Sequence, residues 1–133
     1  MIDFQYIKEA NVDEKHISNL LEKIVACEKK NIGEITVIFC SDEYLLEKNI
    51  KHLKHYTLTD VITLDYCIDD IISGDIFISI DRLKENAKKY NVTFLNEMLR
   101  VIIHGLLHLL GYDDKTSEQK TIIRKKEEYY LLK

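Results

Sequence analysis

The segment from Thr93 to Gly111 constrains the fold more than any other part of the chain. Thr93 is a typical N-cap residue, and Gly111 suits the left-handed conformation that often ends a helix. Between Met98 and Leu110 almost every position is aliphatic, so a helix here is apolar on nearly all of its faces. We therefore expect a central buried helix, around which the rest of the chain packs.

The remaining segments predict an α+β fold. Four of them are rich in β-branched or aromatic residues and predict strands, at residues 2–7, 35–39, 59–66 and 75–79. Four others have the periodicity of amphipathic helices, at residues 13–28, 42–51, 81–90 and 117–132. The last two strands are separated by a short polar connection that includes Ser73 and Gly74, so we expect them to pair as antiparallel neighbours. With the central helix, the prediction is a four-stranded sheet and about five helices.

The composition is that of an ordinary globular protein and gives no sign of a second domain. The chain has 133 residues, of which 46% are hydrophobic and 32% are charged, with four glycines and no proline. No stretch resembles an interdomain linker, a repeat or a low-complexity segment, so we expect residues 1–133 to form one domain.

The N-terminus and the cysteines both favour a cytoplasmic location. Residues 1–9 carry early charges and no continuous apolar stretch, unlike a signal peptide. A membrane span needs about 20 consecutive apolar residues, and the most apolar segment is shorter and interrupted by charged and imidazole side chains. The cysteines are odd in number and form no Cys-x-x-Cys pair, which predicts free thiols in a reducing compartment for Cys27, Cys40 and Cys67.

His104 and His108 are the residues of the central helix that most clearly predict chemistry. Side chains at positions i and i+4 lie on one face of a helix, so the two imidazoles point the same way. Two imidazoles at this spacing can bind one divalent metal ion, and the carboxylate of Asp114, beyond Gly111, can turn back as a third ligand. Three protein ligands leave one position for water, as in catalytic zinc sites. The spacing alone also occurs without metal, but a buried imidazole without a partner costs free energy, which favours the metal.

Gly105 argues against a peptidase. Zinc metalloproteases with two histidines on one helix carry a glutamate directly after the first histidine. Here that position is Gly105, so the peptidase mechanism lacks its general base. A glycine at this point instead allows close approach of a strand or of a substrate backbone.

Three segments resemble the signatures of the YbeY family, bacterial endoribonucleases of ribosomal RNA maturation. The segment HGLLHLLGYDD at residues 104–114 resembles the family's H-G-x-x-H-L-x-G-Y-D-H and departs from it only at the last position. Thr59-Asp60-Val61 resembles the family's T-[DN]-V strand, and Gly74-Asp75-Ile76 resembles its G-D-[IL] strand. The order and the spacing agree, and the resemblance covers about residues 35 to 130.

The resemblance implies a fold, a cofactor and a substrate. It implies an α+β fold with a small mixed sheet and one zinc ion at the C-terminal end of the central helix, held by His104, His108 and Asp114. It also implies a cytoplasmic endoribonuclease that acts in 16S ribosomal RNA maturation and ribosome quality control. RNA and the small ribosomal subunit would be its partners, without a membrane. A non-catalytic ribosome-associated factor with a structural metal stays open as an alternative, and a metallopeptidase is a weaker one.

Two positions depart from the family pattern. The last ligand position is usually histidine and is Asp114 here. A carboxylate is a harder ligand than imidazole, so it weakens zinc binding and makes Mn²⁺ or a similar ion more competitive. Upstream of Thr59, Leu53 stands where many members carry an arginine for phosphate or transition-state contact. We predict a branch of the family in which both changes occur together.

The sequence leaves the proton-transfer residue and the RNA-binding surface open. Asp60 and Asp75 are candidates for proton transfer, because both begin strands in segments that match the family; strand-end hydrogen bonding is the alternative. The net charge of −4 excludes binding of nucleic acid by bulk charge, so RNA needs a local basic patch. Interleaved glutamates leave plain solvated surfaces as the alternative. The candidate patches are Lys48, Lys51 and Lys54; Arg82, Lys84, Lys88 and Lys89; and Lys120, Arg124, Lys125 and Lys126.

Overall fold

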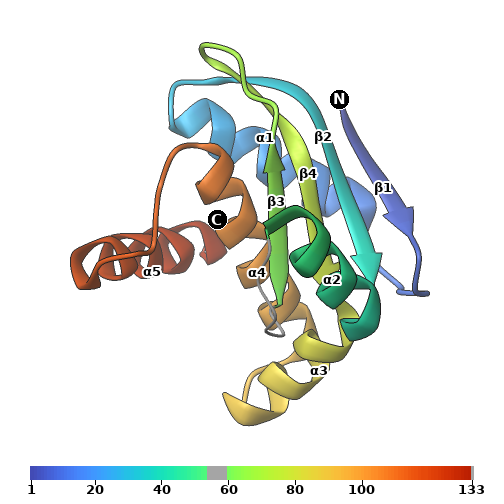
Figure 1. Ribbon diagram of the computed structural model, residues 1–133. Coiled ribbons are helices and arrows are strands. Elements are labelled where there is room, and N and C mark those ends of the chain that lie inside the picture. The colour runs from blue at the N-terminus through green and yellow to red at the C-terminus, as the bar shows by residue number, and fades with distance from the viewer. Residues whose placement is uncertain (54–59, 133) are drawn as a thin grey trace.

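A four-stranded sheet forms the centre of the computed structural model, which describes residues 1–53 and 60–132 (Figure 1). Its strands are, in spatial order, β1 (Ile2–Tyr6), β2 (Asn31–Cys40), β4 (Ile71–Ser79) and β3 (Val61–Asp65). β2 pairs in parallel with β1 and with β4, whereas β3 and β4 are antiparallel. The predicted mixed sheet and its antiparallel pair are therefore confirmed.

Five α-helices accompany the sheet within the described residues, as predicted. They are α1 (Glu14–Cys27), α2 (Asp42–Lys48), α3 (Ile80–Lys89), α4 (Phe94–Leu109) and α5 (Ser117–Leu131). The N-caps expected from the sequence are present, because the side chains of Asp13, Ser41 and Thr93 each accept a hydrogen bond from a backbone N–H in the first turn. The α+β prediction is confirmed.

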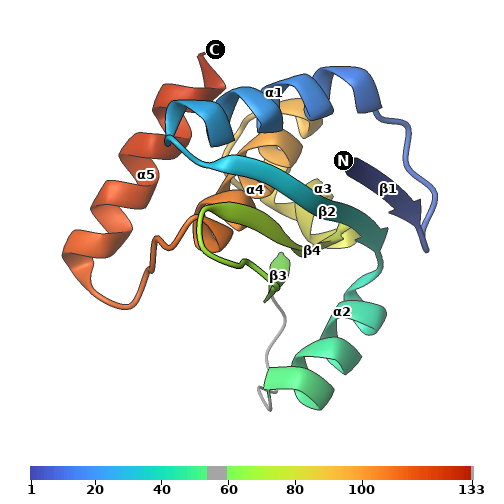
Figure 2. The ribbon, with the colours of Figure 1, turned by 90° about the horizontal axis from the view of Figure 1, so that it is seen from above.

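The helices cover the two faces of the sheet unequally (Figure 2). α1 and α4 pack on one face, where Ile76 and Ile78 of β4 join the main hydrophobic core. α2 lies on the other face, where Phe77 packs with Ile62 and Leu45 in a smaller cluster. This division follows from strand geometry, because successive side chains of a strand point to opposite faces.

α4 is the central buried helix that the sequence predicts. It packs against α1, α3, α5, β3 and β4 and buries residues on nearly all of its faces. Gly105 lets α4 approach the sheet, because a Cβ atom there would lie only 2.8 Å from Cγ2 of Ile76 and 3.3 Å from Cγ2 of Val61. The close approach of a strand at Gly105 is thus confirmed.

Three predicted boundaries are wrong, and the first is that β2 begins at Asn31 and not at residue 35. β4 begins at Ile71, because Ser73 and Gly74 belong to the strand and not to the connection. The N–H of Tyr66 donates to the carbonyl of Ser73 at 2.9 Å, and Gly74 lies opposite residues of both β2 and β3, so pairing on two sides extends a polar segment as a strand. The helix predicted over residues 42–51 divides, since α2 ends at Lys48 and a π-helical segment with wider turns follows at Asn49–Leu53.

Two further predictions concern membrane-spanning helices and disulfide bonds. No single helix among the described residues is long and apolar enough to cross a membrane. α3 and α4 reach the required length and composition only as a pair, which is bent by 117°. The three cysteines are free thiols, as predicted.

Candidate metal centre

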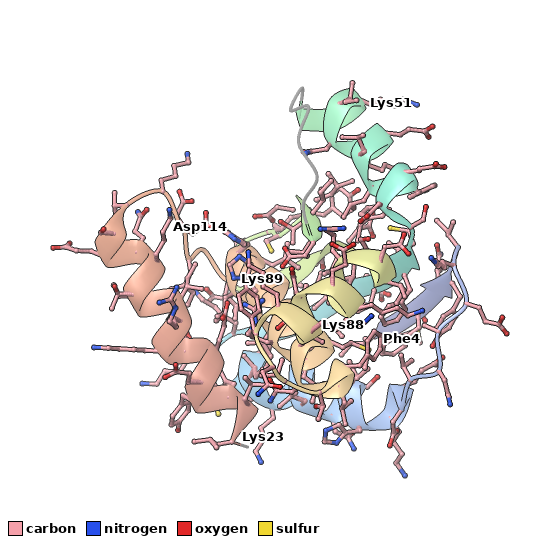
Figure 3. The ribbon with its side chains drawn as sticks, turned by 90° about the horizontal axis from the view of Figure 1, so that it is seen from below. Phe4, Lys23, Lys51, Lys88, Lys89 and Asp114 are labelled. Carbon is pink, nitrogen blue, oxygen red and sulfur yellow. The ribbon has the colours of Figure 1, made fainter. Side chains whose placement is uncertain are left out.

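The end of α4 determines where Asp114 lies. The N–H of Gly111 donates to the carbonyl of His108 at 3.0 Å, and the N–H of Tyr112 donates to the carbonyl of Leu107 at 3.0 Å. These bonds form a Schellman cap, which uses the positive φ of 102° at Gly111. The chain therefore turns after α4, and Figure 3 shows Asp114 on the segment that leads to α5.

His104, His108 and Asp114 form a group that could hold one metal ion. Their ligand atoms all lie within 4.8 Å of one another. The Nε2 atoms of the two histidines are 3.0 Å apart, and Oδ2 of Asp114 lies 3.5 Å from that of His104 and 3.4 Å from that of His108. A tetrahedral ion bound at about 2.0–2.1 Å places its ligand atoms roughly 3.3–3.4 Å apart. The donor triangle therefore has the size and the nitrogen–oxygen composition of a divalent transition-metal site.

A cavity adjoins this group. His104 and Asp114 are partly exposed and line a cavity of about 190 Å³. The rest of its wall comes from α4 and α5, through Arg100, Lys120, Ile123, Arg124 and Glu127. Three donors beside an open cavity leave room for water or a substrate oxygen, which is the usual arrangement of a catalytic metal.

Glu127 on α5 holds the imidazole ring of His104. Its Oε2 lies 2.5 Å from Nδ1 of His104. With Glu127 ionised, Nδ1 carries the proton and donates to the carboxylate, so Nε2 keeps its lone pair for a metal. Burial alone would lower the pKa of His104, but the hydrogen bond and charge of Glu127 and the charges of Asp60 and Asp114 raise it. The same negative charge makes Nε2 a more basic ligand.

Arg100 connects His104 to buried carboxylates through Glu127. Its Nε and Nη2 donate to the two oxygens of Glu97 at 2.9 and 2.6 Å, and its Nη1 donates to Oε1 of Glu127 at 3.3 Å. Nη2 also lies 3.9 Å from Oδ2 of Asp60. Glu97 and Glu127 are only 1% and 5% exposed, so their charges depend on this pairing.

The charges in this part of the molecule do not balance. Among the described side chains, Arg100 has three carboxylates around it, and His104 and His108 have a fourth, so carboxylates outnumber the cations even with His104 protonated. Excess negative charge in a partly buried site is unfavourable, and a divalent cation would reduce it. The four carboxylates are those of Asp60, Glu97, Asp114 and Glu127.

Asp60, one candidate for proton transfer, lies beside this group. Its pKa is raised, because burial outweighs the opposing charges of Arg100 and His104. Nδ2 of Asn86 donates to its Oδ2 at 3.4 Å. A carboxyl group with a raised pKa that interacts with His104 is suited to proton exchange near the cavity.

Asp75, the other candidate, is not brought to the metal-ligand group. Gly74 and Ile76 face α4, since a Cβ atom on Gly74 would lie 2.8 Å from Cδ2 of Leu109 and Ile76 packs against Gly105. Asp75 lies between them in β4, so its side chain points to the opposite face of the sheet. There its Oδ2 accepts a hydrogen bond from the hydroxyl of Tyr66 at 3.0 Å.

Comparison with known proteins agrees with this geometry. A family model described as endoribonuclease YbeY matches residues 3–133. The chain belongs to the YbeY family. The resemblance stated from the sequence motifs is therefore confirmed, and with it the endoribonuclease class that the family's description carries.

Relatives in the YbeY family cover nearly the whole chain. A protein named endoribonuclease YbeY from Flavobacterium johnsoniae is 46% identical over 129 residues, which are 96% of this chain and 93% of the relative. The protein of the same name from Phocaeicola vulgatus is 42% identical over 129 residues, 96% of this chain and 94% of the relative. The solution structure of TM1509 from Thermotoga maritima matches with a TM-score of 0.70 at 30% identity, over 98% of this chain and 87% of that one.

The charged residues that support the YbeY-family motif in this chain were not predicted as site residues from the sequence. Arg100 lies one turn before His104 on the same helix face, and Glu127 follows Ile123 on the buried stripe of α5. Charged residues within apolar helical stripes were the available signal, because a buried charge needs a partner. Glu97 is the third such residue.

The second departure from the YbeY pattern lies at the edge of the described residues. Leu53 is the last residue of the π-helical segment, and Lys54 and Thr59 lie outside the described ranges.

Proposed function

We propose that this chain is a metal-dependent endoribonuclease whose metal ligands are His104, His108 and Asp114. The spacing of the three donor atoms beside an open cavity carries the proposal. The family supports the reaction class, since the relatives are named endoribonucleases. Residues 1–133 act as one hydrolase domain in this proposal.

The chemistry divides between the ion and the side chains around it. Zinc held by His104, His108 and Asp114 would supply Lewis-acid chemistry toward a phosphoryl oxygen and would activate water as a nucleophile near neutral pH. Glu127 keeps Nδ1 of His104 protonated, which directs Nε2 toward the donor group. Arg100 holds Glu127 in place and offsets part of its charge. Gly105 packs against the sheet and supplies no base, which disfavours the metallopeptidase alternative.

Zinc is the ion that we propose, with Mn²⁺ as its competitor. Two imidazoles and one carboxylate form an accepted zinc ligand set. The carboxylate of Asp114 is harder than the usual imidazole, so the preference for zinc over Mn²⁺ is expected to be smaller than with three histidines.

Asp60 is the residue that we propose for proton transfer, and Asp75 provides the matched control. Both changes to asparagine remove one carboxylate, but only Asp60 lies beside His104 and Arg100. We expect Asp60→Asn to lower kcat by roughly 10²–10⁴-fold with metal content unchanged, and Asp75→Asn to retain activity. Loss of activity in metal-loaded Asp75→Asn, with Asp60→Asn active, would reverse the assignment.

The proposed setting is the cytoplasm, and the proposed substrate is RNA of the small ribosomal subunit. The family's role in 16S ribosomal RNA maturation and ribosome quality control supports this substrate by analogy. The subunit itself would be the partner that presents the RNA.

Metal analysis combined with an RNA cleavage assay tests the proposal. The purified chain is expected to bind one ion and to cleave structured ribosomal RNA, and His108→Ala is expected to lose both properties while remaining folded. His16, an exposed residue of α1, provides the matched control, and His16→Ala should retain both metal binding and cleavage. Cleavage that persists unchanged in His108→Ala would indicate a contaminating nuclease. A folded, metal-loaded chain without cleavage would favour a ribosome-associated factor in which the ion ties the end of α4 to the turn after Gly111.

A further inference from the structure

One face of α5 carries two cations to the cavity of the metal-ligand group. Lys120, Ile123, Arg124 and Glu127 line the same cavity as His104 and Asp114. Their spacing of three and four residues places them on one side of the helix. Ile123 and Glu127 are buried, whereas Lys120 and Arg124 are exposed, so the cavity has an acidic floor and a basic rim.

The two rim cations differ from Arg82, Lys126 and Lys48, which already contact a carboxylate or an aromatic ring. Within the described residues, the side chains of Lys120 and Arg124 make no hydrogen bond or ion pair. By contrast, Arg82 pairs with Asp42 at 3.1 Å. Lys126 pairs with Glu28 at 3.1 Å, and Nζ of Lys48 lies 5.2 Å from the ring centroid of Phe77.

The position of the other basic residues also excludes them from the cavity. Lys51 lies on the π-helical segment that follows α2, and Figure 3 shows it well apart from Asp114. Lys88 and Lys89 end α3, which precedes the N-terminus of α4, whereas the metal-ligand group lies in and just beyond the C-terminal half of α4. Lys125, next to Arg124, lines a different hollow on the far side of α5.

We propose that Lys120 and Arg124 bind phosphates of the RNA strand on either side of the bond to be cleaved; this inference rests on the proposed function. An exposed cation exchanges hydration for a phosphate contact at little cost, and the guanidinium fork of Arg124 matches two phosphate oxygens. Arg100 is unsuited to this role, because Glu97 and Glu127 already take its donors. Phosphate contacts carry no base identity, so the rim positions the strand without reading its sequence.

The salt dependence of RNA binding tests whether Lys120 and Arg124 contact phosphates. Binding of a labelled single-stranded RNA to the metal-loaded chain is measured by stopped-flow anisotropy, before cleavage. The slope of log K against log salt concentration is expected to become shallower by about 0.7 in Lys120→Ala and in Arg124→Ala, and by about 1.4 in the double variant. Arg124→Lys keeps the charge and should keep the slope. Lys125→Ala removes the same charge from the far side of the helix and should leave the slope unchanged.

Each outcome separates this inference from the proposed function. Unchanged slopes in both alanine variants of a chain that cleaves RNA would overturn the rim and leave the endoribonuclease in place. Equal effects in Lys125→Ala would overturn it as well, because only bulk charge would then matter. Shallower slopes in Lys120→Ala and Arg124→Ala of a chain that does not cleave RNA would support the rim and contradict the proposed catalysis.

Discussion

The charges between α4 and α5 are partly buried and strongly unbalanced, whereas those where α2 and α3 begin are nearly balanced and reach solvent. The first group, termed here the α4–α5 cluster, consists of Arg100 with four carboxylates, Asp60, Glu97, Asp114 and Glu127. Two of these carboxylates are almost fully buried, and the cluster adjoins both histidines and the cavity.

The second group, termed the α2–α3 cluster, has the two cations Lys8 and Arg82 and three carboxylates, of which Glu85 is 67% exposed and lies 2.7 Å from Nη2 of Arg82. Nε of Arg82 lies 3.1 Å from Oδ1 of Asp42, which also accepts a hydrogen bond from the hydroxyl of Ser79 at 2.6 Å. Lys8 donates to Asp81, which also accepts the N–H of Asp42 at 2.9 Å. Asp42 and Asp81 each have a cation and a further donor, and the carboxylate of Glu85 is exposed to water, so no buried charge is left uncompensated.

The two clusters differ in whether their excess charge is buried. The α2–α3 cluster joins the loop after β1 to the first turns of α2 and α3, and the one carboxylate in excess, that of Glu85, is exposed. The α4–α5 cluster keeps excess negative charge at a partly buried position, which lowers stability unless a cation binds. Unbalanced, partly buried charge beside imidazoles therefore distinguishes the candidate metal centre more clearly than the number of ion pairs does.

The largest effect, on the free energy of unfolding, is expected when the arginine of each cluster is replaced by methionine. Arg100→Met leaves Glu97 and Glu127 buried without their cation, and we expect it to lower the free energy of unfolding by about 3–5 kcal/mol. Arg82→Met leaves Asp42 with Ser79 and near solvent, and we expect a loss of about 1 kcal/mol or less. Urea unfolding at pH 7 measures both. Equal losses would show that the clusters do not differ in balance.

The next effect concerns metal affinity. Glu127→Gln removes the charge that orients and polarises His104, and we expect the affinity for zinc to fall by about 10–100-fold. Glu128→Gln, at the adjacent exposed position, removes the same charge and should leave the affinity unchanged. Competition against a chromophoric chelator measures both variants. An unchanged affinity in Glu127→Gln would mean that Glu127 serves only the packing of α5.

Local sequence patterns predict the elements that bury one continuous face. α1, α4 and α5 follow helical periodicity, and His104 and His108 follow from spacing within one helix. The metal-ligand group was predictable because its third member, Asp114, lies directly after the cap at Gly111. These features depend on residues that are near one another in sequence.

The parts that the sequence did not predict depend on distant partners. Gly74 belongs to β4 because β2 and β3 flank it, and no local pattern shows this. Arg100 and Glu127 meet only through the packing of α5 on α4. Asp75 lies on the face of the sheet that α4 does not cover. Which face α4 covers is set by tertiary packing, so the separation of Asp75 from His104 could not be predicted from the sequence.

A smaller effect is expected from restoring the family's usual ligand. Asp114→His replaces a hard oxygen by a softer nitrogen, and we expect the ratio of zinc to Mn²⁺ affinity to rise by about ten-fold, or about 1.4 kcal/mol. Asp113→His places the same side chain one residue earlier, where no ligand is proposed, and should leave the ratio unchanged. Parallel titrations with the two ions measure it. An unchanged ratio in Asp114→His would show that Asp114 does not contact the ion.

The smallest effect, on the pH dependence of stability, is expected in the α2–α3 cluster. The hydrogen bond from Lys8, followed by that from the N–H of Asp42, lowers the pKa of Asp81 below its ordinary value of 3.8. A lowered carboxylate pKa contributes stability that is present above the unfolded value and is lost as the pH falls through the folded one. Asp81→Asn should therefore be less stable than the parent at pH 6, by less than about 1 kcal/mol because the pair is partly exposed. The difference in the free energy of unfolding between the parent and Asp81→Asn should narrow as the pH approaches 3. Urea unfolding midpoints of the two chains between pH 6 and pH 3 measure it. A difference that stays constant with pH would show that the Lys8–Asp81 charge pair contributes nothing.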